Sequence, residues 1–478
     1  MILLTVRNRL FGGIKVVIIQ ESILKEHQRK KNTSLSPLLR SYTQKVENVD
    51  PLTFFTIGNK YFPGKRFFWT EPSNETILVG LGFSHTIEVN QSLNRFQNIE
   101  EEWKRLLITN QKNQKEFKIG TGPMLFGGFS FDPYKKKTKL WSNFLDAKFV
   151  MPTLMLTVHK DECYLTTNFL YNKEEEIQTR EHELNPIKDE LLTEYNLPSE
   201  TLLGQDFKMT EVMPEEWKQS VKEVTNKIKQ GQVEKVVLAR EVRLFFDNSI
   251  EITNVIANLR EQQPLSYTFA FENGKDCFVG ASPERLVKKE NQEVLSTCLA
   301  GSIKRGTTLK EDDDYGNLLL NDKKNIIEHE VVVHMIKDAM SKACNHLEVP
   351  SKPSLYKMRD IQHLYTPVKG IVKEDVSLLS IVESLHPTPA LGGFPKEEAI
   401  KMIRETEVLD RGWYAGPIGW IDSRDNGEFA VAIRSALLQE NEASLFAGCG
   451  IVGDSEPESE YKETEIKFKP MLSALGGI

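Results

Sequence analysis

The chain has 478 residues, of which 40% are hydrophobic and 27% charged, a composition typical of a globular protein. A formal net charge of −7 does not favour binding to nucleic acid or to an acidic membrane surface, and no apolar run reaches the roughly eighteen residues of a membrane helix. The five cysteines are scattered without a CxxC pair, which is typical of reduced thiols in a cytoplasmic protein rather than of disulfides or a zinc site.

The first third of the chain is predicted to be rich in β-structure. KVVII at 15–19 indicates a strand, and the basic cluster at 25–32 is interpreted as a solvated helix face. Between 50 and 170, segments such as LTFFTIG, TILVGLG and LMLTVHK alternate apolar and polar residues, which indicates strands. The Gly- and Phe-rich segment GPMLFGGFSFDP, at 122–133, predicts a pair of buried strands.

A charged, helical stretch runs from 171 to about 205 and is predicted to end the N-terminal portion, 1–205. Beyond it, the expected elements are helices near 214–231, 250–262 and 318–346, a strand at 233–244 and further strands around 266–303. This succession indicates a mixed, largely antiparallel α/β or α+β protein. The glycines of GSIKRGT are not followed by the lysine of a P-loop, so a phosphate loop is rejected there.

Two charged residues stand in apolar strand sequence. Lys235, in EKVVLAR, shares a strand face with Val237 and Ala239, so its amine either points outward from a strand end or is partly desolvated and usable as a base. Glu284, in CFVGASPERL, is a candidate for a raised pKa and for a general acid. An isolated carboxylate of this kind is more often paired with a nearby arginine, so both alternatives remain open for each residue.

A third carboxylate lies in a helical stripe. In DKKNIIEHEVVVHMIKDAM, Glu328 is followed at i+4 and i+8 by Val332 and Ile336, which predicts a carboxylate within an apolar face. Buried carboxylates are paired, neutral or bound to a metal. Glu328 is therefore a candidate metal ligand.

The acidic run AGCGIVGDSEPESEYKETEIK, at 447–467, divides in two. A helix that begins near 457 places Glu460, Glu463 and Lys467 on one face, whereas Glu456 and Glu458 fall in the entry turn, so at most two of the glutamates point inward. The glycines at 448 and 450 would admit close approach of a ligand. Two or three carboxylates with few histidines suit Mg²⁺, although spacing alone does not bring Glu328 to Glu463.

A series of segments between about 210 and 475 resembles the chorismate-utilising enzyme family, which includes isochorismate, salicylate, anthranilate and aminodeoxychorismate synthases. The segments are KVVLAR (235–240), GASPERL (280–286), LAGSIKRG (299–306), EHE (328–330), IQHLYTPVKG (361–370), HPTPALGGFPK (386–396), RGWYAGPIGW (411–420), VAIRSALL (431–438), and AGCGIV with EYKETEIK (within 447–467). The N-terminal half resembles the family more weakly, through FGGFSFD at 126–132. The resemblance implies one large α/β (α+β) domain of two packed, largely antiparallel sheets flanked by helices, with 206–478 as its catalytic region.

The resemblance also implies roles for individual residues. Glu328 and Glu463 would hold Mg²⁺ with support from Glu460, Lys235 would activate water, and Glu284 would protonate the departing hydroxyl. The substrate chorismate would contact Gly301, His363, Ala390, Tyr414, Arg434, Gly448 and Lys467. Water would then attack ring carbon C2 as the C4 hydroxyl leaves, which requires a lysine with a lowered pKa and a glutamate with a raised pKa.

Three positions favour isochorismate synthase within this family. Lys235 stands where ammonia-using relatives carry Gln, Leu299–Gly301 replaces the lysine-bearing segment of aminodeoxychorismate synthases, and HPTPALGG resembles the isochorismate-type loop. Ala390 occupies a position where salicylate-forming relatives tend to carry Thr. The expected protein is cytoplasmic, serves menaquinone biosynthesis and needs no glutaminase subunit, nucleic acid or membrane.

Four alternatives remain open at this point. They are a salicylate synthase, an isochorismate synthase of siderophore biosynthesis, an anthranilate or aminodeoxychorismate synthase that needs a glutaminase, and a non-catalytic binding protein. The last would have lost an acid, a base or a metal ligand, and the sequence retains a candidate for each.

Overall fold

The protein is described by a computed structural model that covers residues 37–90, 93–109, 118–193, 206–359 and 361–476. The strand expected at 15–19 and the basic segment at 25–32 lie outside the described residues. No helix in the described part of the chain is both long and apolar enough to cross a membrane.

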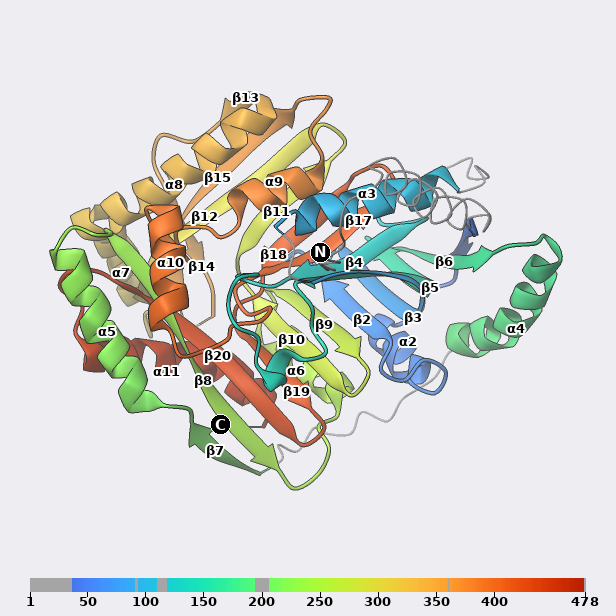
Figure 1. Ribbon diagram of the computed structural model, residues 1–478, viewed down its shortest axis with the longest axis horizontal. Helices are drawn as coiled ribbons and strands as arrows, with labels where there is room; N and C mark the ends of the chain where they lie inside the picture. Colours follow the sequence, from blue (N-terminus) through green and yellow to red (C-terminus); the bar gives the residue numbers. More distant parts are fainter. Residues whose placement is uncertain (1–36, 91–92, 110–117, 194–205, 360, 477–478) are drawn as a thin grey trace, which may run out of the picture.

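The strands form one antiparallel network with two branches that share β5 (Figure 1). The first branch contains, in spatial order, β1 (Leu38–Val46), β6 (Glu162–Tyr171), β5 (Ala147–His159), β3 (Thr76–Val89), β2 (Arg66–Thr70), β9 (Tyr267–Asn273), β10 (Asp276–Ser282), β19 (Ser435–Gln439), β20 (Glu442–Ile451) and β8 (Lys235–Phe246), with β7 (Phe207–Glu211) and β16 (Gly393–Phe394) paired to β8. The second branch continues from β5 through β4 (Met124–Phe129), β17 (Pro417–Asp422), β18 (Gly427–Val431), β11 (Arg285–Glu290), β12 (Glu293–Lys304) and β15 (Ile361–Val372), to which β13 (Cys344–Glu348) and β14 (Ser354–Lys357) pair.

The two branches pack face to face across an aromatic core. Phe67 of β2 stacks on Phe126 of β4 with ring centroids 4.4 Å apart, and the rings of Trp69 of β2 and Phe271 of β9 lie 5.8 and 6.0 Å from the same Phe126 ring. All four rings are removed from solvent. The expectation of two packed, largely antiparallel sheets is confirmed, with the addition that β5 belongs to both.

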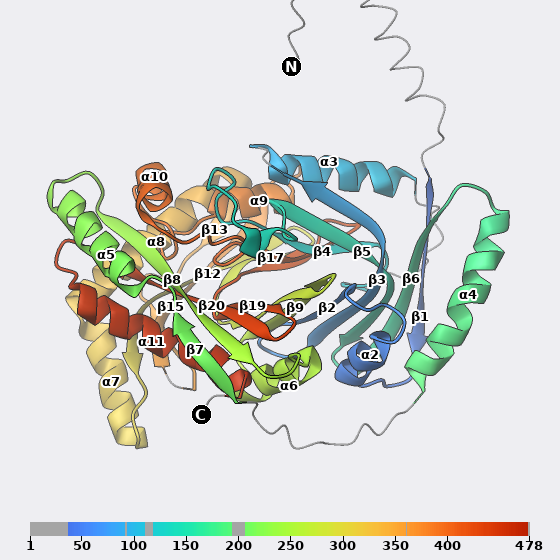
Figure 2. The ribbon, with the colours of Figure 1, turned by 60° about the horizontal axis from the view of Figure 1, so that its bottom comes forward.

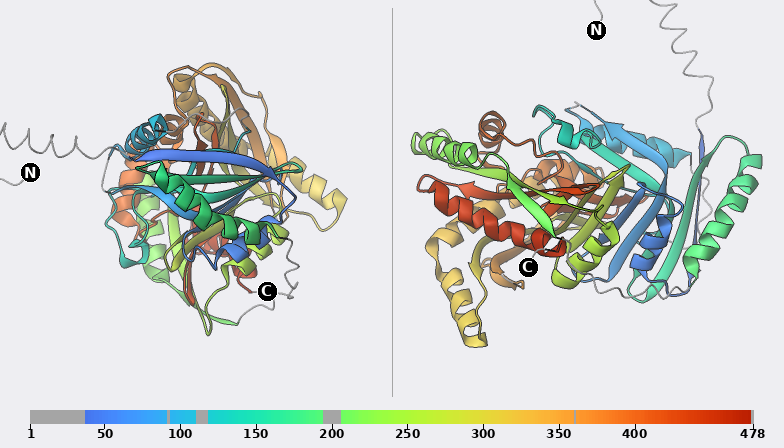
Figure 3. Two further views of the ribbon diagram at one scale, coloured as in Figure 1. Left: turned by 90° about the vertical axis from the view of Figure 1, so that its right-hand side faces the viewer. Right: turned by 90° about the horizontal axis from the view of Figure 1, so that it is seen from below.

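Helices cover the outer faces of this network (Figure 2). They are α2 (Pro51–Gly58), α3 (Arg95–Ile108), α4 (Glu175–Leu192), α5 (Pro214–Lys229), α6 (Ile252–Gln262), α7 (Leu309–Asn321), α8 (Lys323–Ala343), α9 (Leu378–Leu385), α10 (Lys396–Thr406) and α11 (Pro457–Ala474). Strands from before and after residue 205 pair directly, β2 with β9 and β4 with β17. The helix α11 packs on β20 and α6. The right-hand panel of Figure 3 shows α11 from below, in red.

Three predicted elements were wrong. The segment LTFFTIG is not a strand but lies in α2, because Asp50 caps the helix by accepting a hydrogen bond from the Thr53 amide at 2.6 Å and Pro51 opens its first turn. GPMLFGGFSFDP contributes the single strand β4 rather than a pair. The long helix expected near 318–346 is two helices, since Asp322 ends α7 and caps α8 through the Asn325 amide at 2.7 Å.

Candidate active site

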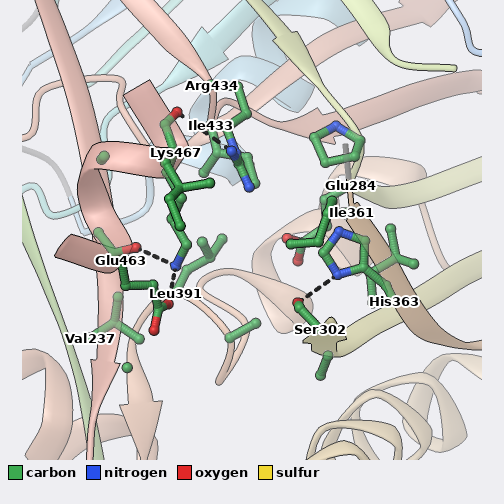
Figure 4. Close-up of a pocket in the computed structure, with 18 of the residues that line it drawn as sticks. Val237, Glu284, Ser302, Ile361, His363, Leu391, Ile433, Arg434, Glu463 and Lys467 are labelled. Carbon is green, nitrogen blue, oxygen red and sulfur yellow. Dashed lines mark hydrogen bonds and ion pairs between the residues drawn. The ribbon is translucent and has the colours of Figure 1, made fainter. Parts of the chain in front are cut away.

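One cavity of about 940 Å³ lies where β8, β20, α8, α11 and the loop 386–391 meet. All of the predicted site residues line it: Lys235, Glu284, Gly301, Glu328, His363, Ala390, Tyr414, Arg434, Gly448, Glu460, Glu463 and Lys467. Figure 4 shows two groups on facing walls, with Lys467, Glu463 and Arg434 on one side and Glu284 and His363 on the other. Segments far apart in the sequence therefore meet in one place.

Lys235 is the first residue of β8 and its side chain is 22% exposed. Its Nζ lies 3.8 Å from Oε2 of Glu328, on α8. Val237, the next residue on the same strand face, also lines the cavity. The amine therefore points toward Glu328 within the cavity instead of outward into bulk solvent.

Glu284 is buried in the turn between β10 and β11. Its backbone is fixed by two hydrogen bonds, since its amide donates to Oγ of Ser282 at 3.2 Å and its carbonyl accepts from the Val431 amide at 3.0 Å. Burial raises the pKa of this carboxyl group to about 7, against the smaller opposing effects of the Thr388 hydroxyl and the Arg434 charge. The neighbouring Arg285 pairs with Glu428 at 2.8 Å, so it does not neutralise Glu284.

The raised pKa of Glu284 predicts a pH-dependent cost to stability. The folded protein holds this proton up to about pH 7, whereas the unfolded chain releases it near the ordinary value of 4.5, so stability falls as the pH rises between these values. At about 1.4 kcal/mol per pKa unit, the cost above pH 7 approaches about 3 kcal/mol. We expect Glu284→Gln to raise the free energy of unfolding by up to about that amount at pH 8, with little gain at pH 4.5. Denaturant unfolding of both proteins at the two pH values measures it, and an equal difference at both would contradict it.

The three predicted metal ligands are acidic side chains that line the cavity from two helices. Glu463 Oε1 accepts a hydrogen bond from Lys467 Nζ at 2.7 Å, and Glu460 Oε1 accepts one from Ser455 Oγ at 2.6 Å, while Glu328 faces Lys235. Among the residues that the structure describes, no three His, Cys, Asp or Glu side chains already form a metal cage. The donors are carboxylate oxygens, so their chemistry fits a hard cation such as Mg²⁺.

The division of the acidic run is confirmed at one glutamate and corrected at another. Glu458 turns away from the cavity, pairs with Lys218 of α5 at 2.9 Å and is 72% exposed. Glu456, which was assigned only to the entry turn, is the N-cap residue of α11 and also lines the cavity. Three glutamates of this run therefore reach the cavity rather than two at most.

Glu328 does not belong to the buried stripe of α8. The buried positions are His329, Val332, Ile336, Met340 and Ala343, and the Glu328 side chain is 32% exposed at the edge of the cavity. His329 was not predicted as part of this stripe, and its Nε2 lies 2.7 Å from Oγ1 of Thr366. The spacing of His329 with Val332 and Ile336, at i+3 and i+7, was the signal that would have shown the true stripe.

Cationic groups lie on the α11 side of the cavity. Lys467 Nζ donates to the Gly448 carbonyl at 2.8 Å, in addition to Glu463. Arg434 has a left-handed backbone with φ of 51° between β18 and β19, and its guanidinium lies 3.4 Å from the Lys467 carbonyl. A non-glycine residue held in this conformation is often found at a functional site.

His363 supplies a neutral polar group on the facing wall. Its Nδ1 lies 2.7 Å from Oγ of Ser302, and its buried Nε2 has no hydrogen-bond partner among the described residues. Burial, followed by the nearby Arg434 charge, lowers its pKa to about 4. The imidazole is therefore uncharged at neutral pH, and its free nitrogen can hydrogen-bond to a ligand.

A buried ion pair beside the cavity, formed by Glu407 and the cavity-lining Arg411, was not predicted from the sequence. Arg411 binds both carboxylate oxygens of Glu407 at 2.7 Å and also donates to the Leu391 and Val237 carbonyls at 3.0 and 2.8 Å. Glu407 in turn accepts from the Ala239 amide at 2.7 Å. The pair therefore ties β8 to the loop 386–391, and only its i,i+4 spacing was visible in the sequence.

Comparison with known proteins shows that the chain is similar to chorismate-binding enzymes. The family model described as "Chorismate binding enzyme" matches residues 23–476. The chain is 44% identical over 470 residues to "Isochorismate synthase MenF" of Bacillus subtilis strain 168, covering 97% of this chain and 99% of that protein. It is 35% identical over 450 residues to "Salicylate biosynthesis isochorismate synthase" of Pseudomonas aeruginosa, covering 92% of each chain.

A solved structure shares the fold. The menaquinone-specific isochorismate synthase MenF from Escherichia coli superposes with a TM-score of 0.76 over 95% of this chain and 99% of that chain. The sequence identity is 23%, so this likeness bears on the architecture alone. The two-branched sheet and its helices are thus an architecture already seen in a solved structure.

Proposed function

The chain belongs to the chorismate-binding enzyme family, and we propose that it is an isochorismate synthase, an isomerase that interconverts chorismate and isochorismate. The similarity to the Bacillus subtilis protein, over 97% of the chain, supports this proposal. The observation that carries it is that Lys235 and the buried Glu284 line one cavity. In that cavity they could serve as the base at ring carbon C2 and the acid at the C4 hydroxyl of one bound substrate.

The proposed reaction adds one water and releases another. Lys235, in its neutral form, takes a proton from the water that attacks ring carbon C2, while the double bonds shift and the C4 hydroxyl departs. Glu284, kept protonated by burial up to about pH 7, donates the proton that turns this hydroxyl into water. The forward step leaves Lys235 protonated and Glu284 ionised, and loss of one proton from the lysine to solvent and uptake of one by the glutamate restore both groups for the next turnover. The reverse reaction uses the same groups with their roles exchanged.

Substrate binding is assigned to the cationic wall. Chorismate carries two carboxylates, and the nearby Arg434 and Lys467 offset negative charge and orient the ring. His363 is uncharged, so it contributes hydrogen bonding without a further positive charge. We assign Tyr414 and Gly448, which line the same wall, to contacts with the carboxylates.

We propose that Glu328 and Glu463 hold Mg²⁺, with Glu460 in support. The support is the carboxylate chemistry of the three side chains on one cavity. When bound, Mg²⁺ would offset the charge of a substrate carboxylate and fix its position.

Isochorismate rather than salicylate is the expected product. Salicylate formation would require bound isochorismate to lose its enolpyruvyl side chain as pyruvate, and the Ala390 methyl offers no hydrogen bond to hold that side chain in an eliminating pose. We expect purified protein with chorismate and Mg²⁺ to approach an equilibrium of chorismate and isochorismate. Chromatography, with a lactate dehydrogenase assay for pyruvate, measures both products. Stoichiometric pyruvate and salicylate would establish the salicylate synthase alternative instead.

We further propose that the product serves menaquinone biosynthesis without a glutaminase partner. The likeness to the Bacillus subtilis MenF protein extends through the N-terminal half as well as the catalytic region, which supports this assignment. Deletion of the gene in its own organism should lower menaquinone, and an unchanged menaquinone content would contradict the pathway assignment.

A further inference from the structure

We propose that Gly450 is a positioning residue for Lys235, because its missing side chain provides the space in which the amine of that lysine lies. The inference rests on the proposed function, since it concerns the base of that reaction. Lys235 begins β8, and Gly450 lies opposite Val237 on the antiparallel neighbour β20. The lysine side chain runs along this pair of strands and passes over Gly450.

The contact distances show how little space remains at Gly450. A Cβ atom built on this residue would lie 2.7 Å from Cε and 3.3 Å from Nζ of Lys235, and 4.0 Å from its Cδ. Real Cβ atoms essentially never approach another heavy atom to under 3.0 Å. An alanine at 450 and the observed position of the Lys235 amine are therefore incompatible.

Gly448, two residues earlier on β20, makes space for different atoms. A Cβ there would lie 3.1 Å from the Leu238 carbonyl oxygen and 3.4 Å from the Tyr414 hydroxyl. Both glycines were predicted from the sequence to admit close approach of a ligand. At Gly450 the space is filled by the protein's own lysine, so this glycine acts on the substrate through the position of Lys235.

The substitution Gly450→Ala should displace the amine without unfolding the protein. Gly450 lies within a strand and is not among the glycines with positive φ, so an alanine can adopt its backbone conformation. The atoms in conflict are the far end of a flexible, 22% exposed side chain, which can move. A displacement of about 1 Å from a reacting atom can lower a rate on the order of 10²-fold.

A double-mutant cycle tests this inference. We compare Gly450→Ala in the wild-type background and in the Lys235→Ala background, measuring kcat, KM and the thermal unfolding midpoint. We expect Gly450→Ala to lower kcat on the order of 10²-fold with KM changed only a few-fold, and to have no further effect once Lys235 is absent. The matched control is Gly453→Ala, whose Cβ would meet only Ile228 and Lys229 side-chain atoms at 3.7 and 3.9 Å, and it should keep wild-type kcat.

The outcomes separate this inference from the function on which it rests. An active wild type with an equally active Gly450→Ala, an equal loss in both backgrounds, or a Gly450→Ala chain that does not fold would each overturn only the role of Gly450. A folded wild type that forms no isochorismate would overturn the proposed function and this inference together.

Discussion

Lys235→Ala and Glu284→Gln are each expected to lower kcat by a factor on the order of 10² to 10⁴ while the protein stays folded. Lys235 and the buried Glu284 both line the cavity. A substrate bound there would have one group available for each of the two proton transfers. Loss of either group leaves one of the two water molecules without its proton donor or acceptor. The ratio kcat/KM is measured from chorismate and, separately, from isochorismate, and it must fall by the same factor in both directions because the substitution leaves the equilibrium constant unchanged.

Surface substitutions of the same kind provide the controls. Lys222→Ala on α5 and Glu293→Gln on β12 alter exposed residues away from the cavity, so both should keep wild-type kcat. A Lys235→Ala enzyme with near-normal turnover would show that the base is elsewhere. A Glu284→Gln enzyme with near-normal turnover would contradict its assignment as the acid.

Activity is expected to disappear on chelation of Mg²⁺ and to return when Mg²⁺ is added back. Glu463→Gln should abolish this recovery at Mg²⁺ concentrations that saturate the wild type, since Glu463 faces the cavity and is assigned to the metal. Mg²⁺ titration of activity, together with calorimetric Mg²⁺ binding to the enzyme without substrate, measures the effect.

Glu458→Gln is the matched control for the metal assignment. Glu458 lies five residues earlier on the same helix but pairs with Lys218 at the surface, so its substitution should leave the Mg²⁺ dependence unchanged. Equal losses for the two variants would refute the division of the acidic run. Full activity in the presence of a chelator would refute the metal proposal as a whole.

The spacing of apolar and charged residues predicted the helices and strands for which only one type of secondary structure fitted that spacing. The helix at 457 and its inward face of Glu460, Glu463 and Lys467 follow from i+3 and i+7 spacing, and the structure shows that face on the cavity. The run LTFFTIG has apolar residues at spacings that suit either a strand or a buried helix. The helix forms there because Asp50 caps its first turn.

Assembly of the site could not be predicted from spacing. The cavity joins Lys235 to Glu284 and Glu328 through pairings between strands that lie far apart in the sequence, such as β8 with β20, and no local pattern specifies such pairings. The resemblance to a known family predicted in advance that these residues lie together in one site. It did not supply the Glu407–Arg411 pair or the contact between Lys235 and Gly450, because both depend on distances that only the three-dimensional structure contains.

Lys235 is assigned to activate a water that attacks ring carbon C2, so the new ring hydroxyl should come from solvent. Running the reaction briefly in water enriched in oxygen-18 and measuring the label in isochorismate by mass spectrometry tests this origin. We expect one solvent oxygen atom in the ring hydroxyl of each newly formed isochorismate molecule. Unlabelled isochorismate would show that the hydroxyl moves within the substrate and that Lys235 does not activate a water.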